Sequence, residues 1–305
     1  MKFTVVIPAY RPTTLDTAIE SIRRQSYTDW DLVVVGQGRE AGVREAVERH
    51  SAIEARVRYA HIPRNGTCRA RNAGAQSSTS EYLAFIDDDC EAREDWLSTL
   101  ANYLDSKPEI GLVGGAVIRP PKPRPGIAVC PQVIPSESVY DPSATPGRPP
   151  AGWDWIGCNL GIRRTVYERI GPFDEYLGPG TDFPAGEDTD YKLRLEAAGV
   201  KMAATPTAVV WHTHGYRYGV KVVIRNARNY AYGNNGLAGK LTLLGDARGA
   251  DWQRITRRQC LTDWLKLKPW RLPIDLFRLK NAVDAYQLCL SRYRVDNGLL
   301  CPREG

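Results

Sequence analysis

The stretch Phe3-Thr4-Val5-Val6-Ile7, followed by Pro8-Ala9-Tyr10-Arg11-Pro12, decides the fold of this chain. Its first five residues are apolar or β-branched, which is typical of a buried strand, and the prolines that follow end that strand. A segment with the spacing of a helix begins at Leu15. A strand, a loop and a helix in this order form the first half of a βαβ unit.

The same alternation continues to residue 118 and predicts an α/β domain with a mostly parallel sheet flanked by helices. The predicted strands are Phe3–Ile7, Leu32–Val35, Val57–His61, Tyr82–Ile86 and Leu112–Ile118. The predicted helices are Leu15–Gln25, Val43–His50, Cys68–Gln76 and Asp95–Leu104. Since open α/β sheets bind their ligands at the carboxyl ends of their strands, we expect the functional site there.

Ten of the 21 prolines lie between residues 120 and 150, a density that argues against a helix or a central strand and predicts a long loop or flap. Beyond this loop, strands are expected at Gly157–Ile162 and Ala208–His212, and a helix is expected at Thr189–Ala198. We therefore expect one α/β domain over residues 1–219.

Residues 220–305 differ from this domain in both pattern and charge. Glycines and prolines interrupt their helical spacing, which predicts a C-terminal extension of short helices. The interrupting residues are Gly233, Gly236, Gly239, Pro269 and Pro273. The extension carries 16 basic and 7 acidic residues, a net charge of +9, whereas residues 1–219 carry 25 and 28. The net charge of +6 for the whole chain is therefore a property of the extension.

The composition excludes several classes of protein. The chain has 305 residues, 43% of them hydrophobic, which suffices for a large core and excludes a disordered or collagen-like chain. Its apolar runs are far shorter than the roughly 18 residues of a membrane span, and a signal-peptide pattern is missing, so we expect a cytoplasmic protein. Its seven cysteines form no Cys-x-x-Cys pair, which predicts reduced, mostly buried thiols rather than disulfides or a zinc site.

Asp87, Asp88 and Asp89 directly follow the apolar strand that ends at Ile86. Three adjacent carboxylates repel one another unless a cation binds them, and Mg²⁺ or Mn²⁺ prefers carboxylate and phosphate oxygens. The two-residue period of a strand would place Asp87 and Asp89 on one side. The alternative interpretation is an aspartate-rich turn or helix cap without a ligand.

A second acidic group, Glu187-Asp188-Thr189-Asp190, begins a predicted helix. The helix dipole favours acidic residues at a helix N-terminus, so capping is one interpretation. The glycine-rich loop Gly178-Pro179-Gly180-Thr181 precedes this group. A carboxylate at the mouth of such a loop can act as a general base toward a hydroxyl.

Two further motifs carry imidazole and guanidinium groups. His212 and His214 are two of the four histidines, and their i, i+2 spacing after a strand indicates metal ligation. Arg69 and Arg71 lie at the start of a predicted helix, where guanidinium groups and unpaired backbone N–H groups suit a diphosphate. The alternatives are structural histidines and an ordinary surface helix.

Taken in order, these motifs resemble those of family 2 glycosyltransferases with the GT-A fold. The matching segments, which cover about the first two thirds of the chain, are Val5–Arg11, Asn65-Gly66, Arg69–Gly74, Asp87–Asp89, Gly171–Glu175, Gly186–Asp190 and Val210–His212. The resemblance implies a Rossmann-like GT-A sheet. It also implies transfer of one sugar from a nucleotide-sugar donor to an acceptor hydroxyl, with inversion at the anomeric carbon.

The resemblance further implies roles for individual residues. Asp188 would be the base that removes the acceptor proton, with Glu187 as the second choice. Asp87 and Asp89 would bind Mg²⁺ or Mn²⁺ on the diphosphate, with one of the two histidines of the later motif as a further ligand. The residues expected to contact the donor are Pro8, Ala9, Tyr10, Arg11, Gln37, Asn65, Gly66, Arg69, Arg71, Asn72, Asp87 and Asp88.

One departure from the family pattern concerns the nucleobase. Family members often have an Asp after the second strand, whereas this chain has Gly36-Gln37-Gly38, and the Gln37 amide can both donate to and accept from a base edge. Uridine specificity is therefore not implied. The Gln-x-x-Arg-Trp signature of processive synthases is missing, so we expect one sugar per visit, in polysaccharide, glycolipid or glycoconjugate synthesis.

Two other functions stay open at this point: an NDP-sugar nucleotidyltransferase, and a non-catalytic protein that binds a sugar nucleotide or an anionic surface. The first class has a glycine-rich, lysine-containing loop after its first strand, which residues 8–12 do not provide. A nucleic-acid partner is not expected, because the acidic groups Asp87–Asp89 and Glu187-Asp188 would repel phosphate.

The extension suggests a further partner. Trp252, Trp264 and Trp270 lie among arginines and lysines, a mixture that suits the interface of an anionic membrane and a lipid-linked acceptor. This mixture leads to the hypothesis of peripheral contact with the inner face of the plasma membrane. The alternative interpretation is that the tryptophans pack onto the catalytic domain and the arginines are solvated.

Overall fold

The computed structural model describes residues 1–39, 42–120, 127–128, 132–213, 216–217, 219–254, 258 and 272–303. The chain divides into two compact units. Unit 1 comprises Met1–Phe173 and Lys192–Arg217, and unit 2 comprises Asp174–Tyr191 and Tyr218–Gly305. These units differ from the predicted division after residue 219 in two places: the segment Asp174–Tyr191 belongs to unit 2, and the later boundary falls after Arg217.

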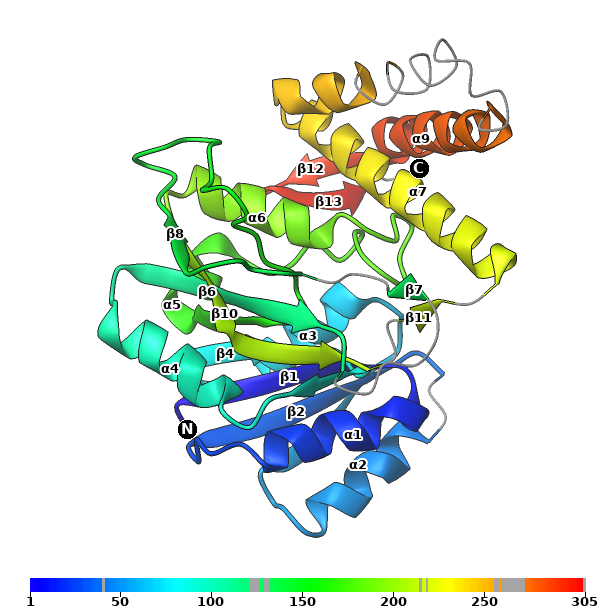
Figure 1. Ribbon diagram of the computed structural model, residues 1–305. Coiled ribbons are helices and arrows are strands. Elements are labelled where there is room, and N and C mark those ends of the chain that lie inside the picture. The colour runs from blue at the N-terminus through cyan, green and yellow to red at the C-terminus, as the bar shows by residue number, and fades with distance from the viewer. Residues whose placement is uncertain are drawn as a thin grey trace. The chain divides into compact units, whose positions relative to one another are not determined.

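Unit 1 is built on a mixed sheet. Among the described residues, its strands are β1 (Phe3–Ala9), β2 (Trp30–Gln37), β3 (Val57–Ile62), β4 (Tyr82–Phe85), β5 (Cys90–Ala92), β6 (Ile110–Ile118), β8 (Ser138–Tyr140), β9 (Leu160–Arg163) and β10 (Lys201–His212). Their order is β3-β2-β1-β4-β9-β6-β10-β5, with β8 paired to β10 (Figure 1). Strands β5, β8 and β9 run antiparallel to their neighbours and the other pairs are parallel, which confirms the predicted mostly parallel sheet.

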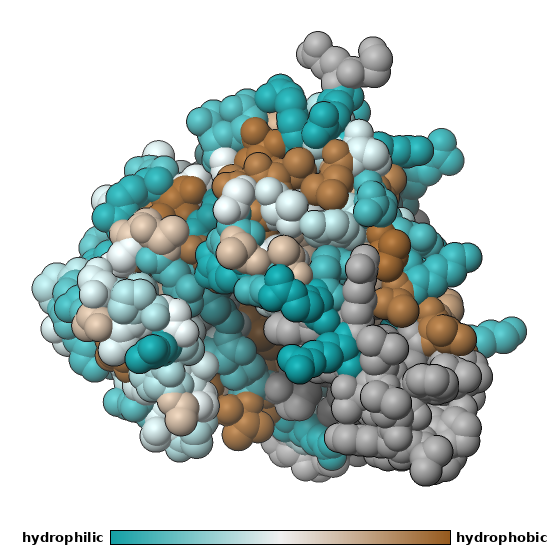
Figure 2. Space-filling view, turned by 90° about the horizontal axis from the view of Figure 1, so that it is seen from above, coloured by the Kyte–Doolittle hydropathy of each residue, from teal (hydrophilic) through white to brown (hydrophobic). Residues whose placement is uncertain are grey.

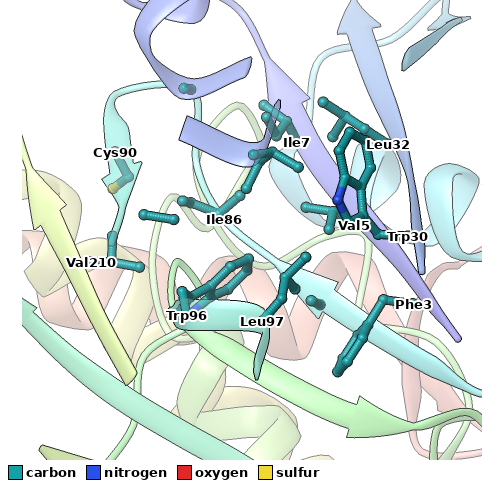
Figure 3. Close-up of a cluster of buried hydrophobic side chains, with 14 of the residues drawn as sticks. Phe3, Val5, Ile7, Trp30, Leu32, Ile86, Cys90, Trp96, Leu97 and Val210 are labelled. Atoms are coloured by element: carbon teal, nitrogen blue, oxygen red, sulfur yellow. The ribbon is translucent and has the colours of Figure 1, made fainter. Parts of the chain in front are cut away.

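Helices cover both faces of this sheet, and β1 shows why its sequence is apolar without interruption. The helices are α1 (Pro12–Arg23), α2 (Val43–Ser51), α3 (Thr67–Gln76), α4 (Trp96–Ser106) and α5 (Arg164–Ile170). A further helix, α6 (Glu187–Ala197), begins among the residues of unit 2 and ends among those of unit 1. Phe3, Val5 and Ile7 point to one face, into a cluster with α1, α2 and α4 that Figure 3 shows in part. Val6 points to the other face and packs against Gly74 of α3, where an added Cβ would lie 2.3 Å away. Both faces are therefore buried, as parallel sheets require.

The parallel strands also place the functional loops. Because β1 is paired in parallel with both β2 and β4, the loops that follow these three strands lie at one edge of the sheet. The loop after β1 is short, since α1 begins at Pro12, where proline suits the first helical position. The loop after β4 contains the three adjacent aspartates.

The proline-rich segment between residues 120 and 150 lies partly outside the described residues. Its described part is a loop that three short pairings interrupt. Strand β7 (Ile127–Ala128) pairs with β11 (Tyr216–Arg217), and two other pairings follow. Gln132 forms an isolated bridge with Val117, and β8 pairs with Met202–Ala204 of β10. The three residues of β8 include no proline, so their N–H groups can take part in the ladder.

Unit 2 contains two long helices and a hairpin. These are α7 (Val220–Leu243), α9 (Leu272–Arg292), β12 (Tyr293–Asp296) and β13 (Leu299–Pro302), and residues 247–254 are also helical. The prediction of short helices interrupted by Gly233, Gly236 and Gly239 is wrong, because α7 runs through all three. Each glycine permits a close approach: a Cβ would lie 2.3 Å from the Ala185 nitrogen, 2.2 Å from the Phe183 ring and 2.6 Å from the Cys289 Cβ, respectively. Pro273 lies in the first turn of α9, where proline is tolerated, and Pro269 lies outside the described residues.

Two absences can be stated for the part of the chain that the structure describes. No helix there is both long and apolar enough to cross a membrane. The cysteines described there are all thiols: Cys68, Cys90, Cys158, Cys289 and Cys301. The first four are buried, as the sequence predicts, whereas Cys130 and Cys260 lie outside the described residues.

Candidate functional site

The three aspartates after β4 form a turn rather than a continuation of the strand. The N–H of Cys90 donates to the carbonyl of Asp87 at 3.1 Å, and β5 begins at Cys90. The two-residue alternation of an extended strand therefore does not set the directions of Asp87, Asp88 and Asp89. Each carboxylate has different partners, which gives the three residues different roles.

Asp88 fixes the loop that follows β1. Its Oδ2 accepts the backbone N–H of Tyr10 at 2.7 Å and that of Arg11 at 2.8 Å. Burial raises the pKa of Asp88 to about 6, and the two backbone hydrogen bonds oppose the rise. Asp88 thus connects the Asp87–Asp89 turn to the β1–α1 loop through backbone contacts.

Asp89 lies between an imidazole and a guanidinium group. Its Oδ1 is 3.3 Å from the Nε2 of His212, and its Oδ2 accepts from Nη1 of Arg11 at 3.0 Å. Burial opposes ionisation of this carboxyl, but the hydrogen bonds and charges of His212 and Arg11 outweigh it and hold the pKa of Asp89 well below its usual range. Asp89 is therefore an ionised, buried carboxylate at neutral pH.

Asp87 is paired with Arg71 of α3, the helix that packs against Val6 on one face of the sheet. Arg71 of α3 is 2% exposed, and its Nη2 lies 3.1 Å from Oδ1 of Asp87, whose side chain is 32% exposed. The Arg71 guanidinium also lies over the ring of Phe173, 5.6 Å from its centroid. Arg71 is therefore a buried cation that is paired with a more accessible carboxylate.

His212 is placed by the pairing of β10 with β5. His212 is the register partner of Cys90, and the next residue, Thr213, donates from both its N–H and its hydroxyl to the carbonyl of Asp89. The ligating atoms of Asp89, Cys90 and His212 lie within 4.8 Å of one another. The predicted ligand His214 lies outside the described residues.

The chemistry of this donor set suits a hard divalent cation. Within the cluster, Asp89 offers carboxylate oxygens, which suit Mg²⁺ and Mn²⁺, and His212 offers an imidazole nitrogen. Asp87, which is not in this cluster, offers a second carboxylate two residues before Asp89. The Cys90 thiol is a poor ligand in its present form, because a hydrogen bond with Cys158 and complete burial raise its pKa well above the usual value. The residues present therefore fit the predicted Mg²⁺ or Mn²⁺.

A hydrogen bond connects the end of β2 to the loop before α3. Gln37 is 4% exposed, and its Oε1 accepts the N–H of Gly66 at 2.9 Å. Gly38 has a φ of +61°, and a Cβ there would lie 2.2 Å from Oδ1 of Asn65, so only glycine fits this contact. The Nε2 of His61 contacts the Gly38 carbonyl at 2.9 Å. Gln37 therefore supports the Asn65-Gly66 loop through its carbonyl oxygen.

Other predicted donor residues also have structural partners. Asn72 is 2% exposed; its amide donates to the carbonyl of Phe173 and accepts from the Phe173 N–H and the Tyr167 hydroxyl. Arg69 donates to the Asn65 carbonyl at 2.7 Å. Within unit 1, Asn72 thus holds the backbone at Phe173. This contact connects the motif at residues 65–74 to the motif that begins at Gly171.

At the β1–α1 loop, the accessible side chains belong to Tyr10 and Arg11. The side chain of Arg11 is 48% exposed and Tyr10 is 58% exposed, whereas Pro8 and Ala9 are buried at the end of β1. The structure thus brings Arg11, Arg71, the Asp87–Asp89 turn and His212 together within unit 1.

In unit 2, Glu187 and Asp188 form the first turn of α6. Both are partly exposed, and the acidic first turn is favoured by the helix dipole. Asp190, two residues later, is buried and forms an ion pair with the fully buried Lys240 of α7. Sequence reasoning missed Lys240; the available signal was a lysine in the otherwise small and apolar segment Gly236–Leu241.

The sequence matches a known family. The family described as Glycosyl transferase family 2 matches residues 4–171, more than half of the chain. A glucosyl-dolichyl phosphate glucuronosyltransferase of Haloferax volcanii is 26% identical over 185 residues, which cover 58% of each chain. A pre-mycofactocin glycosyltransferase of Mycobacterium tuberculosis is 26% identical over 219 residues, which cover 69% of this chain and 42% of that protein. The chain thus matches less than two thirds of the length of either relative.

Solved structures show the same fold. The mannosyltransferase PcManGT from Pyrobaculum calidifontis, in complex with GDP-Man and Mn²⁺, has a TM-score of 0.56 at 15% identity, covering 93% of this chain and 86% of its own. S. aureus TarS 1-349 has a TM-score of 0.57 at 13% identity, covering 99% and 96%. At these identities the likeness shows the fold, which is the GT-A fold. With the family match over residues 4–171, these findings show that the chain belongs to glycosyl transferase family 2.

Proposed function

We propose that this protein transfers one sugar from a nucleotide-sugar donor to an acceptor hydroxyl, with inversion at the anomeric carbon. The observation that carries the proposal is the ionised Asp89 between Arg11 and His212, beside the Asp87–Arg71 pair. Carboxylates, guanidinium groups and an imidazole in one place suit a metal–diphosphate group. The named glycosyltransferases among the relatives, and a structural neighbour that binds GDP-Man with Mn²⁺, support the same assignment.

At the donor, Asp87, Asp89 and His212 would hold Mg²⁺ or Mn²⁺, and Arg11 and Arg71 would interact with phosphate oxygens. A bound divalent cation would neutralise negative charge on the departing nucleoside diphosphate. Arg11 is half-exposed and already oriented by Asp89, so it can approach a phosphate without a large loss of side-chain entropy. Asp88 holds the backbone beside Tyr10, which keeps the nucleoside end of the site in place.

At the acceptor, Asp188 removes the proton of the attacking hydroxyl. Its place in the first turn of α6 leaves it partly exposed, as a base toward an external substrate must be. The oxygen then attacks the anomeric carbon as the nucleoside diphosphate leaves from the opposite side, so one displacement inverts the configuration. No covalent intermediate with the protein is needed. Glu187 is the second choice for the base.

The test combines turnover with stereochemistry. UDP-, GDP- and dTDP-sugars are offered with Mn²⁺ or Mg²⁺ and with saccharide and lipid-linked acceptors, and the released nucleotide and the product anomer are measured by NMR. We expect one donor class to release nucleoside diphosphate and give an inverted product. Release of pyrophosphate from a nucleoside triphosphate in the presence of a sugar phosphate would instead establish a nucleotidyltransferase. Absence of both turnover and nucleotide binding would overturn the proposal in favour of a non-catalytic protein.

We also propose that the acceptor belongs to polysaccharide, glycolipid or glycoconjugate synthesis and is lipid-linked. The lipid-linked acceptor is supported by the relative named glucosyl-dolichyl phosphate glucuronosyltransferase. Polysaccharide synthesis is supported by a relative of Bacillus subtilis named "Putative teichuronic acid biosynthesis glycosyltransferase TuaG". A comparison of transfer to a polyprenyl-phosphate-linked sugar and to the same sugar without lipid tests this assignment. Preference for the lipid-linked form is expected, and equal rates would contradict it.

Within unit 2, α7 and α9 offer a surface for anionic lipid. Ile224 is 50% and Leu276 is 56% exposed, each near exposed basic residues such as Arg225 and Arg278. Figure 2 shows hydrophobic and hydrophilic residues interspersed on the face viewed from above. A mixed apolar and cationic surface suits an anionic bilayer. Flotation with phosphatidylglycerol vesicles at low salt should recover the protein, and recovery equal to that with neutral vesicles would refute this contact.

Of the three tryptophans that suggest a membrane contact, the structure describes Trp252. Trp252 is partly buried, and Arg254 is exposed and forms an ion pair with Asp251 at 2.9 Å. Trp264 and Trp270 lie outside the described residues. The surface of α7 and α9 is therefore the part on which the membrane proposal rests.

A further inference from the structure

Unit 2 contains a buried cluster of charged groups that the proposed chemistry does not use. The Nζ of Lys240 lies 2.8 Å from Oδ2 of Asp174 and also pairs with Asp190. The side chains of Lys240 and Asp174 are completely buried, and that of Asp190 is 4% exposed. Buried ion pairs seldom add stability compared with apolar side chains, so a cluster of this kind calls for another explanation, such as fixing one conformation.

Asp174, one of the two carboxylates beside Lys240, also accepts two backbone hydrogen bonds. Asp174 accepts the N–H of Tyr176 at 3.0 Å and that of Leu300, in β13, at 2.8 Å. Lys240 and Asp174 therefore join four parts of unit 2: the loop at residues 174–176, the first turns of α6, the middle of α7 and the C-terminal hairpin. A single buried ammonium group is the common point of these contacts.

The start of α6 also rests closely on α7. Gly186, directly before α6, has a φ of +92°, and a Cβ there would lie 3.3 Å from both the carbonyl of Gly233 and the Cβ of Leu237. The preceding residue, Ala185, lies so close to Gly233 that a Cβ at 233 would be 2.3 Å from its nitrogen. The backbone at residues 185–186 is therefore packed against α7, and Asp190 is tied to the same helix through Lys240.

We infer that Lys240 is a positioning residue for the base Asp188, an inference that rests on the proposed function. Asp188 lies between the packed residue Gly186 and the tethered residue Asp190, within one turn of α6. Contacts on both sides of Asp188 fix the position and the rotation of that turn about the helix axis. A displacement of about 1 Å in a catalytic group can lower a rate by about 100-fold, so such a tether affects the reaction without touching substrate.

Lys240→Met removes the ammonium group and keeps much of the length of the side chain. We expect kcat for sugar transfer to fall about 10- to 100-fold, while the Kd of the Mn²⁺–nucleoside diphosphate complex changes less than about 2-fold. Hydrogen exchange should become faster at the amides of residues 187–191. Because Lys240→Met leaves two buried carboxylates without their cation, folding is checked by thermal denaturation.

A second variant separates positioning from folding. Lys240→Met combined with Asp190→Asn removes the tether and one of the two buried charges, so it should fold better than the single variant. The inference expects the double variant to keep a low kcat even where it is fully folded. A folded double variant with wild-type kcat would overturn the inference.

Tyr293→Phe serves as a matched control in the same unit. Tyr293 is 3% exposed, its hydroxyl donates to Asp182, and its ring makes an edge-to-face contact with Tyr176. This variant removes a buried polar contact without releasing the first turn of α6. Its kcat should match that of the wild type, and a loss equal to that of Lys240→Met would mean that any perturbation of unit 2 suffices.

A double-mutant cycle with Asp188→Asn distinguishes failure of this inference from failure of the proposed function. If Lys240 acts through Asp188, Lys240→Met causes no further loss in single-turnover rate once Asp188 is replaced. Multiplicative losses would overturn the inference and leave the base assignment intact. Wild-type activity of Asp188→Asn itself would overturn the base assignment.

Discussion

The two acidic regions of this protein look alike in sequence and differ in their partners. Asp87 and Asp89 of unit 1 pair with Arg11, Arg71 and His212, and the side chains of Asp87 and Arg11 are 32% and 48% exposed. Asp174 and Asp190 of unit 2 pair with Lys240, and all three are buried. In the first region Asp87 and Arg11 are accessible to a ligand, although Asp89 and Arg71 beside them are buried, whereas Asp174, Asp190 and Lys240 of the second region are all buried.

This difference shows how one short motif can combine two roles. In Glu187-Asp188-Thr189-Asp190, Asp188 is partly exposed and is the base that we propose, while Asp190 is buried and paired with Lys240. The same holds in the first region, where Asp88 bonds to backbone N–H groups and Asp89 faces His212 and Arg11. The partner of each carboxylate, rather than its place in the motif, separates the roles.

The sharpest test of this contrast compares two neighbours in α6. Asp188→Asn should lower kcat for transfer about 10²- to 10⁴-fold, since a general base typically contributes a factor of that order. Binding of the nucleoside diphosphate, measured by calorimetry, should stay within about 2-fold. Glu187→Gln is the matched control, and a larger loss with Glu187→Gln than with Asp188→Asn would exchange their roles.

Substitution of Lys240 in the buried region should lower the stability of the protein more than it weakens nucleotide binding. Lys240→Met should lower the free energy of unfolding by about 3 to 5 kcal/mol, because removing one partner leaves buried carboxylates uncompensated. Chemical denaturation measures this change. Lys280→Met, which removes an exposed lysine of α9, should change stability by less than about 0.5 kcal/mol. Equal small effects of the two variants would contradict the assignment of Lys240 as a buried anchor.

Substitution of Asp89 in the first region should mainly weaken binding of the nucleoside diphosphate. Asp89→Ala should weaken Mn²⁺-dependent binding of the matching nucleoside diphosphate about 100-fold, because it removes an expected ligand and leaves His212 and Arg11 without their shared carboxylate. Titration in the presence of EDTA should weaken wild-type binding to a similar degree. Binding that is equally tight with and without the divalent ion would refute the metal assignment.

A smaller loss of stability is expected when the hydrogen bond between Gln37 and the Asn65-Gly66 loop is removed. Gln37→Ala leaves the buried N–H of Gly66 without its acceptor and should cost about 1 to 3 kcal/mol of stability. His61→Ala, which removes an exposed contact to the Gly38 carbonyl, should cost less than about 1 kcal/mol. A larger loss with His61→Ala would show that Gln37 is not the main support of this loop.

The sequence was most informative about unit 1, where local pattern and tertiary structure agree. The run Phe3–Ile7 predicted a strand because both of its faces are buried, and the aspartates after β4 predicted a site because parallel strands end at one edge. The role of Asn72 could not be predicted in this way. Its contacts to Phe173 join residues 101 positions apart, and no local pattern encodes such a pair.

Unit 2 was harder to predict because its glycines have two opposite interpretations. Gly233, Gly236 and Gly239 read as helix breakers, yet in α7 they allow Ala185, Phe183 and Cys289 to approach closely. Packing of this kind offsets the low helix propensity of glycine, and the sequence does not show where the partner lies. The buried Lys240 was missed for the same reason, since its two carboxylates come from separate segments.

The most direct test of the central claim is calorimetric titration of nucleoside diphosphates, UDP, GDP and dTDP, with and without Mn²⁺. Wild type, Asp89→Ala and Asp190→Asn are compared under conditions where all three are folded. The account predicts Mn²⁺-dependent binding of one diphosphate that Asp89→Ala loses and folded Asp190→Asn retains. Equal binding by wild type and Asp89→Ala, or loss in folded Asp190→Asn alone, would contradict the division between a ligand-binding and a structural acidic region.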